Sequence, residues 1–436
     1  MRDGARIAAA IAALEDIELH HRPARAALKA WGEASRYAGA KDRAWVAGLV
    51  LDALRHRRSL AWRMRLDGAR AVVIGALRFG WGWSDDQIAD AMLGPHGPGP
   101  LSGQEIEAFV RPTGPDDAPP PVRGDYPDWL DPHFERAFGA SREEEGAALA
   151  ARAPVDLRVN TLKTTVERAL RALEPLGAAR APVLANALRL PAPHPTARAA
   201  PVEAAPEFQK GWFEVQDLGS QIAAAAAGEI KGRQVLDYCA GGGGKTLALA
   251  AGMASTGQLY AHDADARRLS EAVKRAARAA VRNLQVRSPL KPGALSDLEA
   301  RMDVVFVDAP CTGSGTWRRH PDAKWRLRPA QLARRVEEQN AVLAEAARYV
   351  RPGGRLAYVT CSAFAEEDED RVGAFLAAHP GFAATPAIAQ VVGSGLASDA
   401  GLEQLAGRQS REGFIRITPH SFGADGFFIA VLERLR

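Results

Sequence analysis

Hydrophobic residues recur at helical spacing in the first part of the chain. The pattern is clear in IAAAIAALEDI (7–17), AWVAGLVLDALRH (44–56) and ARAVVIGALRFG (69–80), where apolar positions three and four residues apart fall on one face of a helix. From Gly94 to Pro127 the pattern gives way to proline, glycine and acidic residues. Prolines and glycines at this density end helices and strands, so we expect a linker here, with one short helix near 104–110.

A second region, from Tyr126 to about Pro206, predicts short helices mixed with short strands. The segment DLRVNTLK (156–163) is typical of a strand, and LANALRLPA (184–192) predicts another. Between them, TTVERALRALEPLG (164–177) has helical spacing and closes on a glycine, a common helix stop. The region is therefore expected to form a small α+β module.

From about Glu207 onward, strand patterns alternate with helix patterns, the order typical of a mostly parallel sheet covered by helices. The expected strands are RQVLDY (233–238), GQLYAHD (257–263), NLQVRS (283–288), MDVVFVD (302–308) and GRLAYVTC (354–361), and the expected helices are 245–254, 264–280 and 329–350. Two later segments, GFIRITPH (413–420) and DGFFIAVLERL (425–435), are separated by a short turn. We expect them to pair antiparallel at one edge of an α/β Rossmann-like sheet.

Basic residues are in slight excess and are unevenly distributed. Lys and Arg number 56 against 52 acids, for a net charge of +4. Residues 53–66 contain five arginines and no acid, and a second cluster between Arg318 and Arg328 is opposed only by Asp322. Such clusters favour a polyanionic partner. The alternative, weighed equally for either cluster, is a solvated helix face or arginines paired with acids elsewhere.

The remaining composition excludes several classes of protein. The cysteines number 3 and form no C-x-x-C pair, so neither a disulfide framework nor a zinc site is expected. Apolar runs are far shorter than a membrane span. The first residues carry acids inside their apolar stretch and predict a short amphipathic helix rather than a signal peptide. We expect a cytoplasmic monomer with no metal and no membrane association.

The segment VLDYCAGGGGKT (235–246) reads as a strand, a glycine run and a helix start. A phosphate-binding P-loop would need glycine at Cys239, and a dinucleotide fingerprint would need glycine at Thr246. A nucleoside-cofactor loop remains, and Asp263 ends the next strand, where an acid binds ribose hydroxyls. S-adenosylmethionine needs no phosphate cradle and is the preferred ligand; another Rossmann-type ligand is the alternative.

Cys311 and Cys361 each follow a predicted strand, in DAPCTGSGT (308–316) and in TCS (360–362). The carboxyl ends of parallel strands share one edge of a sheet, so both cysteines are expected near the glycine loop. A free cysteine is more often a small core residue, but this shared placement favours catalysis.

Two thiols in such a place suit methylation of cytosine at carbon 5. A thiolate adds to carbon 6 and makes carbon 5 nucleophilic, an acid near N3 stabilises the adduct, and a weak base then removes the carbon-5 proton. Lys245 offers a positive charge that would favour the thiolate.

These motifs resemble the Nop/Sun family of RNA cytosine-5 methyltransferases, and within it the RsmB-type rRNA enzymes. The similar stretches, which fall between about residues 126 and 436, are DLRVNTLK, FQKGWFEVQDLGSQIAAA (208–225), VLDYCAGGGGKT, HDADARRL (262–269), DAPCTGSGTWRRHPDAKW (308–325), YVTCS followed by acids, and DGFFIAVL (425–432). The resemblance implies a class I methyltransferase fold with Cys361 as nucleophile, Cys311 resolving the adduct and Asp308 reading the cytosine edge. It also implies that S-adenosylmethionine is held by Asp263 and by the loop Cys239, Ala240, Gly241, Gly242, Gly243, Gly244 and Lys245.

Two departures from the family pattern concern the cofactor. The family loop usually reads C-A-A-P-G-G-K-T, whereas this one has glycines after Ala240. The family also usually has an Asp after the third strand, near the adenine, where this chain offers Ser288.

The helical region around residues 36–62 resembles the NusB-like RNA-binding domain of the RsmB-type enzymes. Its arginines from Arg55 to Arg65 are predicted phosphate contacts. The tryptophans could stack on bases, but their helical spacing favours core packing; they are Trp31, Trp45, Trp62, Trp81 and Trp83.

We therefore expect a helical NusB-like domain and linker at 1–112, an α+β module at 125–206 and a Rossmann-like methyltransferase domain at 207–436. The expected reaction is methyl transfer from S-adenosylmethionine to carbon 5 of a cytosine in RNA, with 16S rRNA as substrate. The alternatives are the same chemistry on tRNA and a non-catalytic RNA-binding ribosome assembly factor.

Overall fold

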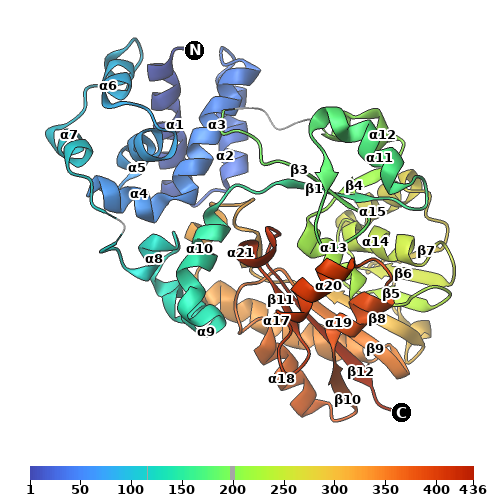
Figure 1. Ribbon diagram of the computed structural model, residues 1–436. Coiled ribbons are helices and arrows are strands. Elements are labelled where there is room, and N and C mark those ends of the chain that lie inside the picture. Colours follow the sequence, from blue (N-terminus) through green and yellow to red (C-terminus); the bar gives the residue numbers. More distant parts are fainter. Residues whose placement is uncertain (115, 197–201) are drawn as a thin grey trace. The chain divides into compact units, whose positions relative to one another are not determined.

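The computed structural model describes residues 1–114, 116–196 and 202–436 (Figure 1). Its contacts divide the chain into two compact units. The first comprises Met1–Arg152, Pro193–Ala200 and Thr316–Leu327, and the second Ala153–Ala192, Pro201–Gly315 and Arg328–Arg436. The division into three domains at 1–112, 125–206 and 207–436 remains a prediction.

The first unit is helical, as the apolar spacing predicts. Its helices are α1 (Asp3–His20), α2 (Ala24–Ala34), α3 (Ala40–Arg55), α4 (Arg57–Met64), α5 (Ala69–Gly75), α6 (Asp85–Leu93), α7 (Gly103–Val110), α8 (Pro120–Arg123), α9 (Asp131–Phe138), α10 (Arg142–Ala150) and α16 (Ala323–Arg326). The predicted linker contains the expected α7 and also the short α8. Prolines occupy the first turn of α8, the one place in a helix where a missing N–H costs nothing.

The core of this unit takes up several of the tryptophans. Trp45 is 8% exposed and meets Trp81 edge to face, with ring centroids 5.1 Å apart. Around them pack fully buried residues such as Ile7, Leu14 and Leu49. Core packing is thus confirmed for Trp45, and Trp31, Trp81 and Trp83 pack against the same core as partly buried residues.

The two basic clusters meet inside the first unit. The Arg55 guanidinium is buried and donates to the carbonyls of Ala151 and Arg318, and burial lowers its pKa to about 10. Lys324 is 1% exposed and donates to the carbonyls of Arg55 and Asp125. The prediction that Arg55 contacts phosphate is therefore wrong.

The next two arginines of the first cluster pair with acids. Arg57 forms an ion pair with Glu18, and Arg58 forms one with Asp128. For these residues the structure follows the alternative interpretation of the cluster, in which the charge is neutralised within the chain.

The second unit begins with a small antiparallel sheet, as predicted for the α+β module. Its strand order is β2 (Ala179–Arg180), β3 (Ala187–Leu190), β1 (Val155–Val159) and β4 (Phe213–Val215). Helices α11 (Val166–Leu173) and α12 (Pro206–Gln209) accompany it. Leu157, Leu173, Leu188 and Phe213 are buried together and form its core.

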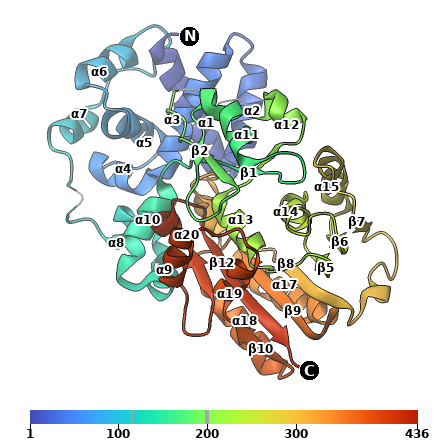
Figure 2. The same ribbon diagram turned by 45° about the vertical axis from the view of Figure 1, so that its right-hand side comes forward.

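The larger sheet has the order β10-β12-β9-β8-β5-β6-β7, with β11 paired to β12 (Figure 2). The bounds are β5 (Gln234–Asp237), β6 (Gln258–His262), β7 (Leu284–Arg287), β8 (Met302–Asp308), β9 (Val350–Thr360), β10 (Phe382–Thr385), β11 (Ile415–Ile417) and β12 (Phe427–Arg434). The strands from β5 to β9 are parallel, and β10, β11 and β12 join antiparallel. Every expected parallel strand is present.

The expected edge position of the last strand is wrong. β12 does pair antiparallel with β11, but it lies between β9 and β10. Residues 427–432 are all buried, because both faces of an interior strand are covered.

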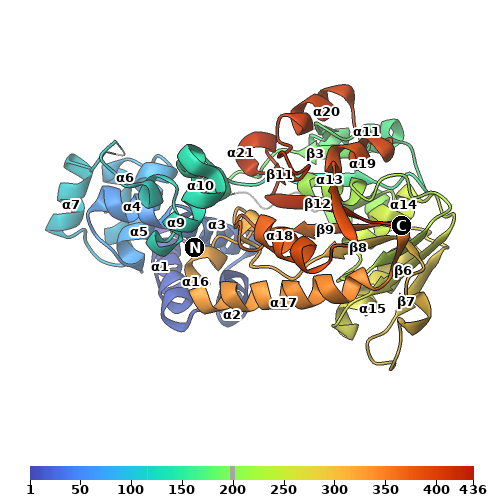
Figure 3. The same cartoon turned by 90° about the horizontal axis from the view of Figure 1, so that it is seen from below.

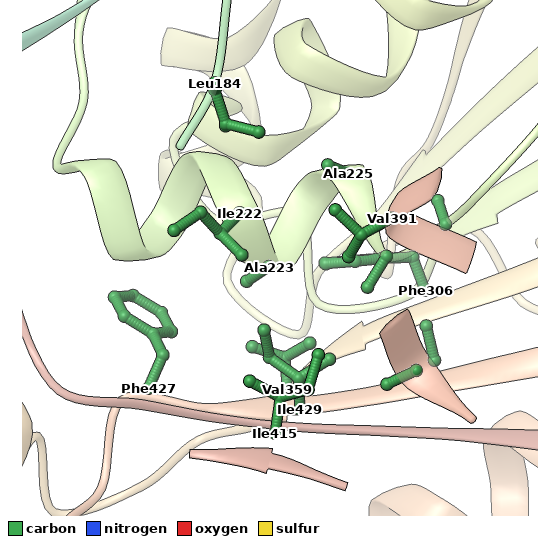
Figure 4. Packing of buried hydrophobic residues seen from close by; sticks show 14 of the residues in the cluster. Leu184, Ile222, Ala223, Ala225, Phe306, Val359, Val391, Ile415, Phe427 and Ile429 are labelled. Atoms are coloured by element: carbon green, nitrogen blue, oxygen red, sulfur yellow. The ribbon is translucent and has the colours of Figure 1, made fainter. Parts of the chain in front are cut away.

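Helices cover both faces of this sheet (Figure 3). Helices α17 (Pro329–Ala347) and α18 (Glu369–Ala378) pack on one face. The other face is covered by α13 (Leu218–Ala225), α14 (Gly244–Gly252) and α19 (Ala387–Gly393). Figure 4 shows Ile222 of α13 and Val391 of α19 directed toward Val359 and Ile429 of the strands. The remaining helices are α15 (Ala266–Arg278), α20 (Asp399–Ala406) and α21 (Pro419–Phe422).

None of the helices in the described ranges combines the length and hydrophobicity that crossing a bilayer requires.

Candidate active site

The glycine-rich loop joins β5 to α14 at the carboxyl edge of the sheet. Gly243 has φ +85°, and a Cβ placed on it would lie 2.8 Å from the Cβ of Ala272 in α15. Only glycine accommodates both this backbone conformation and this approach. The loop is braced by Arg275, which donates to the carbonyl of Gly242 at 2.7 Å. Ala240 and Gly241 precede this turn, and Gly244 begins α14.

Asp263, the residue after β6, faces the same loop. Its buried carboxylate accepts hydrogen bonds from the backbone N–H of Gly241 at 2.7 Å and of Asp265 at 2.8 Å. Asp237 closes β5, is fully buried and accepts from the Thr246 hydroxyl at 2.6 Å. Burial raises the pKa of Asp237 to about 7, against the lowering effect of the Thr246 hydrogen bond, and the Asp308 charge raises it further.

Lys245 and Asp308 form an ion pair beside this loop. Lys245 stands in the first turn of α14 and Asp308 ends β8, and the ammonium lies 2.7 Å from a carboxylate oxygen. Burial acts to lower the pKa of Lys245, but the Asp308 carboxylate, and then the neighbouring Cys361 and Asp237, raise it above its usual value. Lys245 therefore remains a cation at neutral pH. The Asp308 side chain is 31% exposed, so part of its carboxylate is open to a substrate.

The structure brings the two predicted catalytic cysteines together. The Cys311 and Cys361 sulfurs are 3.3 Å apart, and both are free thiols. Their loops are also joined through the Gly315 N–H, which donates to the Cys361 carbonyl at 2.9 Å. The hydrogen bond to Cys361, followed by burial, raises the pKa of Cys311 well above its usual value. Cys311 therefore stays a thiol, and its sulfur lies within hydrogen-bonding distance of the Cys361 sulfur.

A buried carboxylate ties the two cysteine loops to each other. Glu367 accepts from the N–H and hydroxyl of Thr312, next to Cys311, and from the hydroxyl of Ser362, next to Cys361. Gln339 of α17 donates to it as well, at 3.0 Å. Burial raises the Glu367 pKa despite these donors. Glu367 is not among the residues predicted from the sequence, where its only signal is its place among the acids that follow the TCS motif.

Ser288 and Cys239 are the two remaining residues predicted to bind the cofactor. Ser288 follows β7, and its hydroxyl oxygen accepts from the Leu290 N–H at 3.3 Å. Cys239 opens the glycine loop, and burial followed by the Asp237 charge raises its pKa well above the usual value. Cys239 is therefore a neutral, packed thiol rather than a nucleophile.

The loop and Asp263 fit a nucleoside cofactor. The turn at Gly243 has no room for a side chain, and Asp263 places a carboxylate beside the Gly241 N–H. Within the described residues, no group of three or more His, Cys, Asp or Glu side chains could hold a metal ion.

Comparison with known proteins gives two family matches. The family 16S rRNA methyltransferase RsmB/F matches residues 227–433, and the ferredoxin-like domain of RsmF/B-like methyltransferases matches residues 126–197. The second match coincides with most of the predicted α+β module.

Curated relatives align along much of the chain. The probable ribosomal RNA small subunit methyltransferase B of Synechocystis sp. is 31% identical over 71% of this chain and 67% of its own length. The ribosomal RNA small subunit methyltransferase B of Cronobacter sakazakii is 32% identical over 66% of this chain. The alignment spans 65% of the Cronobacter protein.

Among solved structures, a methyltransferase homologue from Pyrococcus horikoshii is 25% identical and superposes with a TM-score of 0.58. The match covers 74% of this chain and 100% of that one. The methyltransferase fold is thus confirmed, and the chain belongs to the RsmB/F family of 16S rRNA methyltransferases.

Proposed function

We propose that this protein transfers a methyl group from S-adenosylmethionine to carbon 5 of a cytosine in 16S rRNA. The observation that carries the proposal is the pair of cysteine sulfurs 3.3 Å apart. They follow β8 and β9, parallel strands that end at the same edge of the sheet as the glycine loop. Two thiols in such a place match a reaction that needs one sulfur to form a covalent adduct and a second group to resolve it. The small-subunit rRNA methyltransferases among its relatives support rRNA as the substrate.

We assign nucleophilic attack to Cys361. Its thiolate forms a bond to carbon 6 of the cytosine, and the electron pair of the opened C5–C6 double bond makes carbon 5 nucleophilic. Lys245 favours this thiolate because its positive charge interacts with Cys361. When bound, S-adenosylmethionine supplies the electrophilic methyl group that carbon 5 accepts.

We assign release of the product to Cys311. Its strongest pKa-raising interaction is the hydrogen bond to Cys361, and that bond is altered once Cys361 is joined to the base. Cys311 then gives its own proton to solvent, and the thiolate that results takes the proton from carbon 5. The electrons of that C–H bond re-form the C5–C6 double bond, and Cys361 leaves as a thiolate.

Asp308 has the position to hold the cytosine. Its partly exposed carboxylate is anchored on one side by Lys245, which leaves an oxygen for the polar edge of the base. That oxygen would accept a hydrogen bond from the 4-amino group of the cytosine, and from N3–H once N3 takes up a proton as the thiolate adds to carbon 6.

The test separates the two cysteines by the step that each variant blocks. Cys361→Ala should stop the reaction before a covalent bond forms, while S-adenosylmethionine binding measured by calorimetry stays within about twofold of wild type. Cys311→Ala should permit attack and methylation but slow elimination, so protein accumulates joined to RNA. On a denaturing gel this species should migrate above the free protein and disappear after nuclease treatment.

The adduct should require cofactor and should be absent from the double variant. Cys239→Ala, which removes the thiol outside the pair, should give no adduct. If Cys361→Ala accumulates the protein–RNA adduct and Cys311→Ala does not, the roles of the two cysteines are the reverse of those proposed. Absence of S-adenosylmethionine binding at millimolar concentration would replace the enzymatic proposal with an assembly role.

A further inference from the structure

The first unit encloses a cavity whose lining includes no residue of the glycine loop and none of the cysteines. Its volume is about 630 Å³, and residues of α3, α4 and the turn after α5 contribute to its wall. Cavities of roughly 300–1,000 Å³ are the usual size of small-ligand sites. We call it the helical-unit cavity.

Three half-buried aromatic residues line the cavity: Trp62, Phe79 and Trp81. The Trp62 N–H donates to the Gly114 carbonyl at 3.0 Å, and the Trp81 N–H donates to Asp52 at 2.8 Å. Their polar edges are therefore satisfied by the protein, and what the indoles offer a ligand is apolar ring surface. Aromatic surfaces of this kind stack on nucleic-acid bases that have left their own stack.

Phe79 lies on an unusual stretch of backbone. Helix α5 continues into a π-helical turn, Ala76–Gly80. π-helical turns are rare and occur frequently at functional sites. The position of the Phe79 ring is thus set by a local distortion of the helix and not by regular α-helical geometry.

Arg63 supplies an uncompensated positive charge at the same wall. Its guanidinium lies 4.1 Å from the Phe79 ring centroid, and its buried Nε has no hydrogen-bond partner. Among the residues that the structure describes, no acid forms an ion pair with Arg63. Burial and the nearby Arg78 lower its pKa, while Arg78 itself pairs with Asp85.

The other charged groups of the wall are already paired. His56 contacts Asp125 at 3.1 Å, and Arg152 pairs with Asp52. Asp125 also accepts hydrogen bonds from the N–H and hydroxyl of Ser59, so the oxygens of both acids are engaged by the protein, whereas Arg63 retains its donors. A planar guanidinium with unused N–H groups matches a phosphate.

We propose that the helical-unit cavity binds a single unstacked nucleotide of the RNA, with its base against Trp62, Phe79 and Trp81 and its phosphate on Arg63. This inference rests on the proposed function, because it makes RNA the ligand of the first unit as well. It places the recognition of single-stranded RNA at a defined pocket, to which the first basic cluster contributes Arg63, while Arg57 and Arg58 of that cluster pair with acids.

The test measures binding of a labelled single-stranded RNA of ten mixed nucleotides to the full-length protein without S-adenosylmethionine. Phe79→Leu keeps apolar bulk but removes the stacking face, and should weaken binding by about 5- to 150-fold. Arg63→Gln should lower the slope of log affinity against log salt by about 0.7, the value for one phosphate contact on a single strand. The matched control is Arg25→Gln, an exposed arginine of α2 that does not line the cavity, and it should change neither quantity.

A second measurement does not depend on the folding of variants. RNA containing 5-iodouridine, irradiated on the wild-type protein, should cross-link to Trp62, Phe79 or Trp81. Cross-links found only elsewhere, or variants that bind with wild-type affinity and salt slope, would overturn the inference. Methyl transfer is measured separately, with 16S rRNA and S-adenosylmethionine: binding at the cavity by a protein that transfers no methyl group there would support the inference and reject the proposed function instead.

Discussion

Replacing Glu367 with glutamine should uncouple the two cysteine loops while leaving the fold in place. The side chain is fully buried. One carboxylate oxygen accepts from the hydroxyls of Thr312 and Ser362, both at 2.5 Å, and the other from the Thr312 N–H at 2.8 Å and from Gln339 at 3.0 Å. Glutamine keeps one of these oxygens and replaces the other with an amide N–H₂, so two of the donors lose their acceptor.

The magnitude follows from those contacts. A hydrogen bond to a charged group contributes about 1.5–3 kcal/mol and a neutral one about 0.5–1.5 kcal/mol, a difference of about 1 kcal/mol per bond. The two hydroxyls facing the new amide can rotate and accept from it. Burial raises the Glu367 pKa, so the neutral side chain also avoids part of the desolvation cost of the charge. The free energy of unfolding should therefore fall by at most about 2 kcal/mol.

Catalysis should respond more strongly than stability. A displacement of roughly 1 Å between reacting groups costs about a hundredfold in rate, and Glu367 holds the residues adjacent to both cysteines. We expect kcat to fall about a hundredfold, with the KM for RNA and the Kd for S-adenosylmethionine within about twofold of wild type. Adduct formation in a Cys311→Ala background should slow by a similar factor.

The matched control is Glu337→Gln, an exposed glutamate of α17 close in sequence to Gln339; its kcat should not change. Glu367→Asp restores the charge on a shorter side chain and should recover part of the lost rate. Wild-type kcat in Glu367→Gln would refute the positioning role. A loss of rate matched by an equal loss of cofactor affinity would show general collapse of the site instead.

Three further outcomes are expected. Asp263→Ala should weaken S-adenosylmethionine binding by about ten- to a hundredfold in calorimetry, because charge-assisted hydrogen bonds to ribose are worth about 1.5–3 kcal/mol; an unchanged Kd would shift the ribose contact to Asp265. Gly243→Ala should lower the free energy of unfolding by at least about 1 kcal/mol in urea titrations and should weaken cofactor binding. The reason is that a residue in the left-handed conformation would place its Cβ too close to Ala272. Wild-type stability and binding would contradict this close approach. Burial lowers the Lys324 pKa from 10.5 to about 7, so between those pH values the unfolded chain binds a proton that the folded chain does not. The contribution of Lys324 to the free energy of unfolding should therefore rise by about 2 kcal/mol from pH 7 to pH 9. Lys324→Met should lack that rise, and an identical pH profile of stability in both proteins would refute the prediction.

The parallel strands and the site at their ends were predictable because each rests on local pattern. Hydrophobic runs ending in Asp308 and in Cys361 predicted β8 and β9, and parallel strands necessarily end at a shared edge. Strand order could not be predicted in this way, because it depends on which buried faces pack together across the whole chain. β12 reads as an ordinary hydrophobic strand, and nothing local distinguishes an interior position from the edge that was expected.

The environment of the charged residues was the hardest property to predict, because a sequence shows where the cationic side chains are but not which groups they contact. Arg55 and Lys324 are 269 residues apart, yet Lys324 donates to the Arg55 carbonyl in a buried network. Glu367 was hidden for a similar reason. Its importance lies in accepting from Thr312, 55 residues earlier, and not in any motif of its own.

The stretch DAPCTGSGTWRRHPDAKW, which as a whole resembles the family, is divided between the two units and has a different role in each. Cys311 and Asp308 lie in the second unit, whereas residues from Thr316 onward belong to the first. There Trp317 and Lys324 are buried, and Lys324 satisfies backbone carbonyls of the helical unit. A substitution at Cys311 should therefore change chemistry with little effect on stability, whereas one at Trp317 or Lys324 should change the stability of the helical unit. Because the chain is continuous between Cys311 and Thr316, the cysteine to which we assign product release is tethered along the chain to the unit that we propose binds an RNA nucleotide.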